Sequence, residues 1–269
     1  MTADNEDAGF IMAYEDSADR VPVLWIHGFP LNNTMWDPQI TGLADVARSI
    51  APDLRGHGLS EPTLATPYTV GLFAEDCLRL LDYLDAEGPV VVAGLSMGGY
   101  VALEFCRRAP ERVLGLILAA TKATPDSDAA KKARDESADV AENEGVQQVV
   151  EGLLGKMLAP RTYRDDPELV EYLHSMMMGT TPEGMVGALK AMRDRPDSTV
   201  DLPEFEMPAL VIHGQDDQLI PTSEAKAMVL ALPSAELVLV PNAGHMVNLE
   251  QSEIFNEAVR SFLEKFYEE

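Results

Sequence analysis

The sequence predicts an α/β protein in which a mostly parallel central sheet is flanked by helices. Short, β-rich apolar runs alternate along the chain with segments of helical periodicity, a pattern typical of α/β folds. Several of the runs are continuously apolar, such as PVVVAG (89–94), as expected of strands that are covered on both faces. The 269 residues, 46% of them hydrophobic, are also enough to bury a sizeable core.

Seven segments are predicted to be strands, namely residues 10–14, 21–28, 49–54, 89–96, 113–120, 209–214 and 235–241. Helices are predicted over residues 70–85, 98–108, 222–231 and 251–266. The second helix must stop before Pro110, because proline cannot continue a helix. One apolar stripe runs along the first helix and consists of Val70, Phe73, Ala74, Cys77, Leu81 and Leu84.

Residues 121–207 interrupt this alternation, because the segment contains helical patterns and no convincing strand. It is too long for a structureless loop in a compact domain. We therefore expect residues 1–120 and 208–269 to form one α/β core, and residues 121–207 to form a helical cap inserted between two strands. The cap is expected to cover the carboxyl edge of the sheet, where open α/β sheets bind ligands.

The charge balance is strongly acidic, with 20 Lys and Arg against 45 Asp and Glu, a net charge of −25. Such a surface repels phosphate backbones and anionic lipids, so neither nucleic acid nor membrane is an expected partner. No apolar run approaches the roughly 20 residues that span a bilayer. The acidic N-terminus lacks the features of a secretory signal, and we expect a cytoplasmic protein. The acidity fits either an ordinary solvated surface or adaptation to a salty cytoplasm.

The two cysteines, Cys77 and Cys106, occupy apolar positions in helical patterns and are expected to be buried free thiols. The chain has no CxxC motif and no His/Cys cluster. The sequence therefore predicts neither a metal site nor a cofactor, and neither cysteine is a candidate nucleophile.

The strongest local signal is the run VVVAGLSMGG (90–99), in which Gly94, Ser96 and Gly98 form a G-x-S-x-G motif between a strand and a helix. A serine on so tight a turn must adopt strained backbone angles, and small neighbours prevent clashes. The turn lifts the Ser96 hydroxyl clear of the sheet edge, beside the free N–H of Met97 at the helix N-terminus. We interpret Ser96 as a nucleophile rather than an incidental serine in a Gly-rich turn.

The run His27-Gly28-Phe29-Pro30 ends an early strand. The N–H of Phe29 is the natural second donor to an oxyanion, because Gly28 lets the chain turn back toward the nucleophile and Pro30 has no N–H to donate. For His27 we favour a structural role, in which it closes a buried strand and fixes the loop, over a catalytic one. Trp36 is expected to pack beneath the site.

The loop APDLRGHGLSEP (51–62) contains Arg55, His57 and Ser60. These residue types occur in catalytic sites, but nothing in the loop pairs a nucleophile with a base. We therefore interpret it as a loop braced by its own polar side chains.

Two later strands end beside titratable side chains. The run ALVIHGQDDQLIP (209–221) supplies Asp216 and Asp217, and His245 follows the last strand. Parallel strands bring their carboxyl ends to one edge of the sheet, so the order Ser…Asp…His can assemble there despite the long separations. His245 would accept the proton of Ser96, and an aspartate would hold the imidazole tautomer.

With these motifs the chain resembles the α/β-hydrolase fold superfamily over nearly its whole length, from HGFP (27–30) to NAGHMVNLE (242–250). It looks most like the small cofactor-free carboxylesterases, which are similar to the enol-lactonases and the non-haem haloperoxidases or perhydrolases. The resemblance implies catalytic Ser96, Asp217 and His245, with Phe29 and Met97 as oxyanion donors.

The resemblance also distinguishes the two adjacent aspartates. The family's usual spacing after this strand is Gly-x-x-Asp, with a proline four residues beyond, and Gly214, Asp217 and Pro221 match it. It therefore implies that Asp217 is the acid of the triad. Asp216 is expected to be a loop-capping side chain.

These features predict a serine hydrolase that cleaves a carboxylic ester or lactone through an acyl-enzyme, with perhydrolysis as a side activity. One alternative is a carbon–carbon bond hydrolase or a 3-oxoadipate enol-lactonase-like enzyme of aromatic degradation, which would keep the same triad. Another is a non-catalytic ligand-binding receptor on the same scaffold. The only partner implied is the small-molecule substrate, and the oligomeric state stays open.

Methionines are frequent in the predicted cap and are suited to adaptable apolar contacts. They predict a pocket for modest apolar acyl or aryl groups, with charged esters disfavoured. The alternative is that most of them fill the core of the cap. The residues concerned are Met157, Met176, Met177, Met178, Met185 and Met192.

Overall fold

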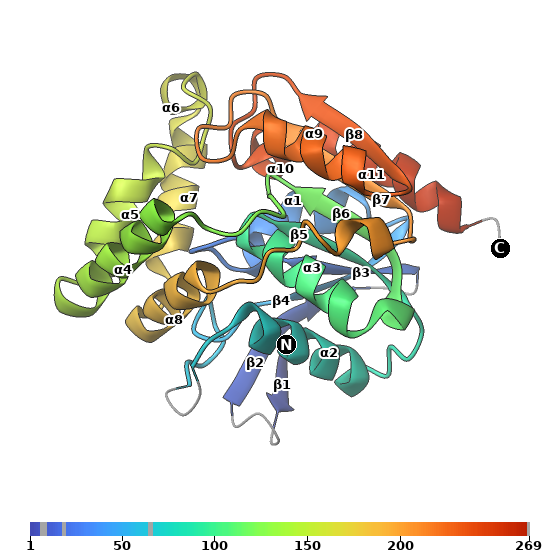
Figure 1. The fold of residues 1–269 in the computed structure, drawn as a ribbon, viewed down its shortest axis with the longest axis horizontal. Coiled ribbons are helices and arrows are strands. Elements are labelled where there is room, and N and C mark those ends of the chain that lie inside the picture. Colours follow the sequence, from blue (N-terminus) through green and yellow to red (C-terminus); the bar gives the residue numbers. More distant parts are fainter. Residues whose placement is uncertain (6–9, 18–19, 64–66, 268–269) are drawn as a thin grey trace.

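The computed structural model describes residues 1–5, 10–17, 20–63 and 67–267. Within these residues eight strands form one sheet in the order β1-β2-β4-β3-β5-β6-β7-β8 (Figure 1). Strands β1 and β2 run antiparallel to their neighbours, and the pairs from β4 to β8 are parallel. The predicted α/β class with a mostly parallel sheet is therefore confirmed. The strands are β1 Thr2–Asn5, β2 Phe10–Asp16, β3 Val21–Ile26, β4 Ala47–Pro52, β5 Val90–Leu95, β6 Val113–Ala119, β7 Ala209–Gly214 and β8 Ala235–Val240.

All seven predicted strands are present, and their observed ends differ from the predicted ones by up to two residues. The structure adds β1, which no sequence pattern predicts because TADN contains no apolar run. This strand is defined by its pairing with β2, in a register that places Thr2 opposite Ala13. An edge strand of this kind depends on backbone hydrogen bonds, which every residue except proline can make.

Helices cover both faces of the sheet (Figure 1). The predicted helix over 251–266 is divided in the structure, because a helix ends at Leu263 and a 3₁₀ turn, Glu264–Phe266, follows it. Cys77 and Cys106 lie on the first two of the four predicted helices and are buried free thiols, as expected. The helices of the core are α1 Asp37–Gly42, α2 Val70–Tyr83, α3 Met97–Arg108, α9 Thr222–Ala231, α10 Val247–Glu250 and α11 Ser252–Leu263.

Five helices lie between β6 and β7 in the chain, and Figure 1 shows them grouped at one side of the sheet. Residues 121–207 are all described, and none of them belongs to a strand, as predicted. Three of the helices begin at side chains that accept a hydrogen bond from the first turn, Ser127, Asp166 and Thr181. The helices are α4 Asp128–Asn143, α5 Val146–Leu154, α6 Thr162–Asp165, α7 Pro167–Met178 and α8 Pro182–Arg193.

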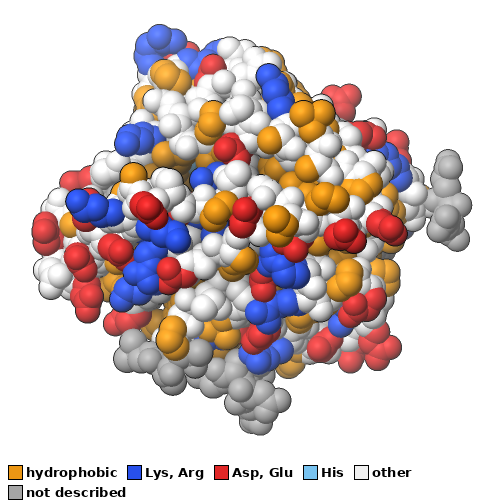
Figure 2. Space-filling model, viewed as in Figure 1, with side chains coloured by type: hydrophobic (Ala, Val, Ile, Leu, Met, Phe, Trp, Pro, Cys, Tyr) orange, Lys and Arg blue, Asp and Glu red, His pale blue; other side chains and the backbone are white. Residues whose placement is uncertain are grey.

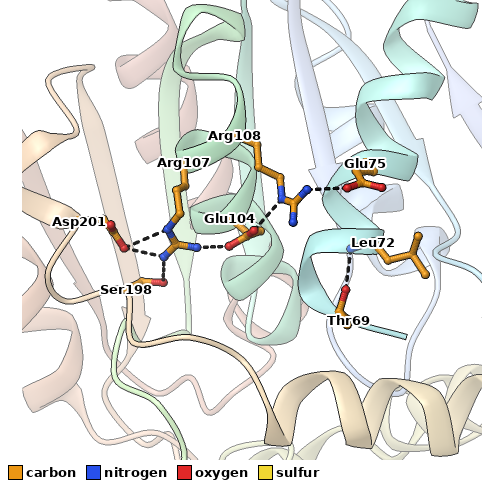
Figure 3. Close-up of polar contacts among 8 residues, drawn as sticks. All are labelled: Thr69, Leu72, Glu75, Glu104, Arg107, Arg108, Ser198 and Asp201. Carbon is orange, nitrogen blue, oxygen red and sulfur yellow. Dashed lines mark hydrogen bonds and ion pairs between the residues drawn. The ribbon is translucent and has the colours of Figure 1, made fainter. Parts of the chain in front are cut away.

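A network of ion pairs at the C-terminal half of α3 ties this helix to two other segments (Figure 3). Arg107 lies 2.5 Å from Asp201, in the segment that leads back from α8 to the sheet, and also pairs with Glu104. Arg108 bridges Glu104 at 2.6 Å and Glu75 of α2 at 2.5 Å. The pairs are partly exposed, so each contributes little alone, but together they fix where the chain re-enters the sheet.

Charged side chains of both signs are interspersed on the face shown in Figure 2. Many of the 20 basic residues therefore have acidic neighbours, although acidic residues outnumber them. No helix in the described part of the chain is long and apolar enough to cross a membrane.

Candidate active site

Ser96 lies at the sharp turn between β5 and α3. Its backbone angles, φ 55° and ψ −113°, are in a region that residues with a side chain rarely adopt. Gly94 makes the turn sterically possible, because a Cβ at that position would collide with the carbonyl of Gly98. The turn is held by a hydrogen bond from the N–H of Ser96 to the carbonyl of Ala119, at 2.9 Å. The strained turn that the G-x-S-x-G motif predicts is therefore present.

Two N–H groups beside this turn are candidates for binding an oxyanion. Met97 is the first residue of α3, where N–H groups have no partner within the helix. Phe29 is in the loop after β3 and lines the same cavity as Ser96. Neither N–H donates to another group in the part of the chain that the structure describes. Both are therefore available to a ligand.

His27 fixes the loop that carries Phe29. Its Nε2 accepts a hydrogen bond from the N–H of Leu54 at 2.9 Å, so the proton resides on Nδ1, which donates to the carbonyl of Gly28 at 2.8 Å. Burial, together with the neighbouring His57, lowers the pKa of His27 to about 3, so the ring is neutral. These contacts match the structural role predicted for His27.

His245 and Asp217 form the polar pair of the site. Nδ1 of His245 lies 2.8 Å from Oδ2 of Asp217, and both side chains are almost fully buried. The other oxygen of Asp217 accepts hydrogen bonds from the N–H groups of Leu219 at 2.8 Å and Ile220 at 3.0 Å. Burial alone would raise the pKa of Asp217, but His245 and these hydrogen bonds more than offset it and hold the pKa well below its usual value. The aspartate is therefore ionised at neutral pH.

The two adjacent aspartates face different surroundings. Asp216 is exposed, whereas the side chain of Asp217 is buried. The loop-capping role expected of Asp216 is wrong, because Asp217 itself accepts the capping hydrogen bonds from the N–H groups of Leu219 and Ile220. One carboxylate thus orients the histidine and also braces its own loop.

Sequence patterns did not single out His213, the penultimate residue of β7. Its Nε2 donates to the carbonyl of Ile220 at 2.8 Å and lies 3.3 Å from Oδ2 of Asp217. It therefore lies near the oxygen that also contacts His245, whereas the loop N–H groups bind the other oxygen. The one available signal was a polar residue inside an otherwise apolar strand.

Arg55, His57 and Ser60 brace their loop, as predicted. Arg55 forms a buried ion pair with Asp76 at 2.5 Å, and Ser60 donates to the carbonyl of Asp53 at 2.7 Å. His57 is buried, with Nδ1 3.1 Å from the carbonyl of Arg55. Trp36 is also fully buried, with its ring centroid 4.9 Å from that of Trp25.

A cavity of about 580 Å³ contains Ser96, His245 and Phe29 in its wall. Residues of α4, α5 and α8 form much of the remaining wall, so the cavity lies between the sheet edge and the inserted helices. Of the six methionines predicted to line it, only Met157 and Met192 do so among the described lining residues. The number of methionines in the cavity wall was therefore overestimated. Three of the remaining four are buried within the helical segment, namely Met176, Met177 and Met185.

Ser96 and His245 are thus brought to one cavity, with Asp217 behind His245, and the two N–H groups beside Ser96 have no acceptor among the described residues. This arrangement can activate a hydroxyl for attack on a carbonyl and stabilise the oxyanion that forms. Among the described residues no group of three or more His, Cys, Asp or Glu side chains is placed to hold a metal ion.

The sequence matches a known family and several known proteins. The model of the alpha/beta hydrolase fold family matches residues 21–252. A 3-oxoadipate enol-lactonase of Acinetobacter baylyi is 28% identical over 97% of this chain and 95% of its own. A non-heme chloroperoxidase of Kitasatospora aureofaciens is 31% identical over 96% of this chain and 97% of its own.

Solved structures give the same picture. A malate-bound thermophilic esterase from Thermogutta terrifontis is 40% identical and superposes with a TM-score of 0.92, covering 95% of this chain and 94% of its own. An enol-lactonase from Burkholderia xenovorans is 25% identical with a TM-score of 0.88, covering 95% of this chain and 97% of its own.

Proposed function

Because the chain belongs to the alpha/beta hydrolase fold family, we propose that it is a carboxylic ester hydrolase that cleaves an ester or lactone through an acyl-enzyme on Ser96. The observation that carries this proposal is the placement of Ser96 and His245 in one cavity, with Nδ1 of His245 2.8 Å from Asp217. The esterase and enol-lactonase relatives support it, since both kinds of enzyme hydrolyse an ester bond.

In the first half of the reaction, the hydroxyl of Ser96 attacks the ester carbonyl while Nε2 of His245 takes its proton. Asp217 keeps the other proton of the imidazole on Nδ1 and stabilises the imidazolium that forms. The N–H groups of Phe29 and Met97 donate to the developing oxyanion. When the tetrahedral intermediate collapses, His245 returns the proton to the leaving alcohol.

In the second half, water takes the place of the alcohol. His245 removes a proton from the water, which attacks the acyl carbonyl, and Ser96 leaves with the proton that His245 returns. In this scheme residues 1–120 and 208–269 form the catalytic core, and residues 121–207 form a cap that shapes the acyl and alcohol pockets. The product is a free carboxylic acid.

An enol-lactonase is the second candidate, because a relative with that name covers 97% of the chain. The same residues would act, and the ring opening would release no separate alcohol. Turnover of lactones compared with open-chain esters distinguishes the two. A ligand-binding receptor would turn over neither class.

The test is Ser96→Ala combined with active-site labelling. The variant should lose kcat on p-nitrophenyl acetate by several orders of magnitude, since nucleophile removal in comparable triads costs about 10⁶-fold. A sulfonyl fluoride should add to Ser96 of the wild type, with the modified peptide identified by mass spectrometry. The control is Ser234→Ala, at an exposed serine, which should keep wild-type activity and labelling. Normal turnover by Ser96→Ala, or labelling at another residue, overturns the proposal.

A further inference from the structure

Three basic side chains surround one buried carboxylate at the edge of the cavity. Nη2 of Arg195 lies 2.8 Å from Oδ1 of Asp126, and Nε of Arg134 lies 3.0 Å from Oδ2. Nζ of Lys122 is 3.7 Å from Oδ1, beyond hydrogen-bond distance. Each oxygen of Asp126 is thus already bound by an arginine, and Lys122 has only a longer-range attraction to it.

Lys122 is placed close to the nucleophile by its neighbour in the chain. The hydroxyl of Thr121 donates to the carbonyl of Ser96 at 2.7 Å, and Lys122 lines the same cavity as Ser96. Its side chain is only 22% exposed. Its ammonium group has three donors, none of which reaches a hydrogen-bond acceptor in the described part of the chain. The ammonium group can therefore donate to an acceptor that enters the cavity.

The two arginines are held in place by other contacts. Arg195 donates to the carbonyls of Met192 at 2.7 Å and Thr124 at 2.9 Å, and its guanidinium lies 4.1 Å above the ring of Tyr100. Arg134 is engaged with Asp126 through Nε. These contacts hold the chain around Asp126, just before α4. In the described part of the chain the whole ammonium group of Lys122 lacks a hydrogen-bond acceptor, whereas Nε of Arg134 is bound and Arg195 is not part of the cavity wall.

The charges around Lys122 favour an anion. Glu224 of α9 is the second carboxylate that faces the cluster, and it accepts a hydrogen bond from Thr124 at 3.1 Å. Three cations thus face two carboxylates, which leaves one net positive charge. Two further charged residues line the cavity, Lys156 and the exposed Glu136, and Glu136 is paired with Lys132 at 3.6 Å. An excess of positive charge here contrasts with the net charge of −25 on the whole chain.

We propose that Lys122 is a specificity-determining residue that binds a free carboxylate of the substrate. The preferred substrates are then esters or lactones that carry a second, ionised carboxyl group, such as half-esters of dicarboxylic acids. This inference rests on the proposed hydrolase function and specifies its substrate class. The methionines predicted a preference for apolar over charged esters, and the proposed site implies the opposite preference. Most of these methionines do not line the cavity, whereas Lys122 does.

The experiment compares two series of p-nitrophenyl esters that differ only in a terminal carboxylate. The anionic series contains the half-esters of succinic, glutaric and adipic acids, and the neutral series contains acyl chains of matching length. The quantity measured is the ratio of kcat/KM for the anionic ester to kcat/KM for its neutral partner. It is determined for the wild type, Lys122→Met, Lys122→Arg and the control Lys226→Met, which removes an equal charge from an exposed position on α9.

The wild type should prefer at least one half-ester over its neutral partner. Lys122→Met should lower the ratio by about ten- to a hundredfold, mainly through KM, the range expected when a hydrogen bond to a charged group is lost. Lys122→Arg should restore much of the ratio, and Lys226→Met should leave it unchanged. Raising KCl should lower the wild-type ratio, because salt screens the attraction.

Two results separate this inference from the function on which it rests. Hydrolysis of neutral esters with no preference for any half-ester, or with the same ratio in Lys122→Met, overturns the carboxylate site and leaves the hydrolase intact. No hydrolysis of either series overturns both. If Lys122→Met does not fold, the test is competitive inhibition of the wild type and of Lys122→Arg by free glutarate. Absence of inhibition of the wild type contradicts the carboxylate site.

Discussion

The carboxylate of Glu250 accepts a hydrogen bond from the hydroxyl of Thr162 at 2.6 Å, although 88 residues separate the two in the chain. It also accepts from the N–H of Ala159 at 2.7 Å and, with its other oxygen, from the N–H of Gly244 at 2.7 Å. Gly244 directly precedes His245. One side chain therefore joins the inserted helical segment to the loop that carries His245.

We expect Glu250→Gln to lower both stability and activity. An amide cannot accept all three hydrogen bonds, because its NH₂ group must face one of the donors, and a buried unsatisfied donor costs about 1–3 kcal/mol. The melting temperature should fall by several degrees. Thermal unfolding and kcat on a neutral ester measure the two effects. Glu253→Gln, at an exposed glutamate of α11, is the control and should behave as the wild type. Equal melting temperatures and equal kcat for Glu250→Gln and Glu253→Gln would show that the hydrogen bonds of Glu250 contribute to neither stability nor activity.

The two aspartates after β7 should respond very differently to the same substitution. Asp217→Asn should preserve the fold but lose up to about 10⁴ in kcat, since an amide favours the wrong tautomer of the imidazole. Asp216→Asn is the matched control, and its exposed position predicts near-wild-type kcat. Steady-state kinetics with circular dichroism to verify folding make the comparison. A larger loss in Asp216→Asn would mean that the contact between Asp217 and His245 is not the one used in catalysis.

Buried neutral histidines should make the fold sensitive to acid. Burial lowers the pKa of His57 to about 4, from about 6.5 in the unfolded chain. Between these values the unfolded state binds the proton and the folded state does not, so stability falls as pH decreases from about 6.5 toward 4. The contribution approaches about 1.4 kcal/mol per pH unit.

His57→Asn should remove this contribution. Urea unfolding of the wild type and the variant at several pH values between 4.5 and 7 gives the difference in unfolding free energy, which should narrow as pH decreases. Other titrating groups affect both proteins alike and cancel in the difference. A difference that stays constant with pH would show that His57 is protonated in the folded protein as readily as in the unfolded one.

Stability should increase with added salt if the acidity is an adaptation to a salty cytoplasm. Repulsion within a chain of net charge −25 destabilises the compact state, and the Debye length falls to about 3 Å at 1 M salt. The melting temperature should therefore rise between low salt and 2 M KCl. Sorbitol at equal osmolality is the control for general exclusion effects. A melting temperature that KCl lowers or leaves unchanged would contradict salt adaptation.

Much of the fold was predictable because its signals are local. Apolar runs such as residues 209–214 and the stripe that includes Phe73 and Leu81 identify strands and helices through their own periodicity. The strained turn at Ser96 was predictable for the same reason, since Gly94 and Gly98 each lie two residues from Ser96 in the sequence. The strand Thr2–Asn5 was not, because only its pairing with β2 defines it.

The sequence by itself determined the strand and helix alternation, the helical insertion and the motif around Ser96, because each depends on residues that are neighbours in the chain. Only the tertiary structure decided that His213 supports Asp217, that most of the methionines pack away from the cavity, and that Lys122 has no hydrogen-bond acceptor among the described residues. These outcomes depend on the direction of side chains and on partners far away in the sequence. A local pattern specifies neither, because the contacts form only when the sheet and the inserted helices pack together.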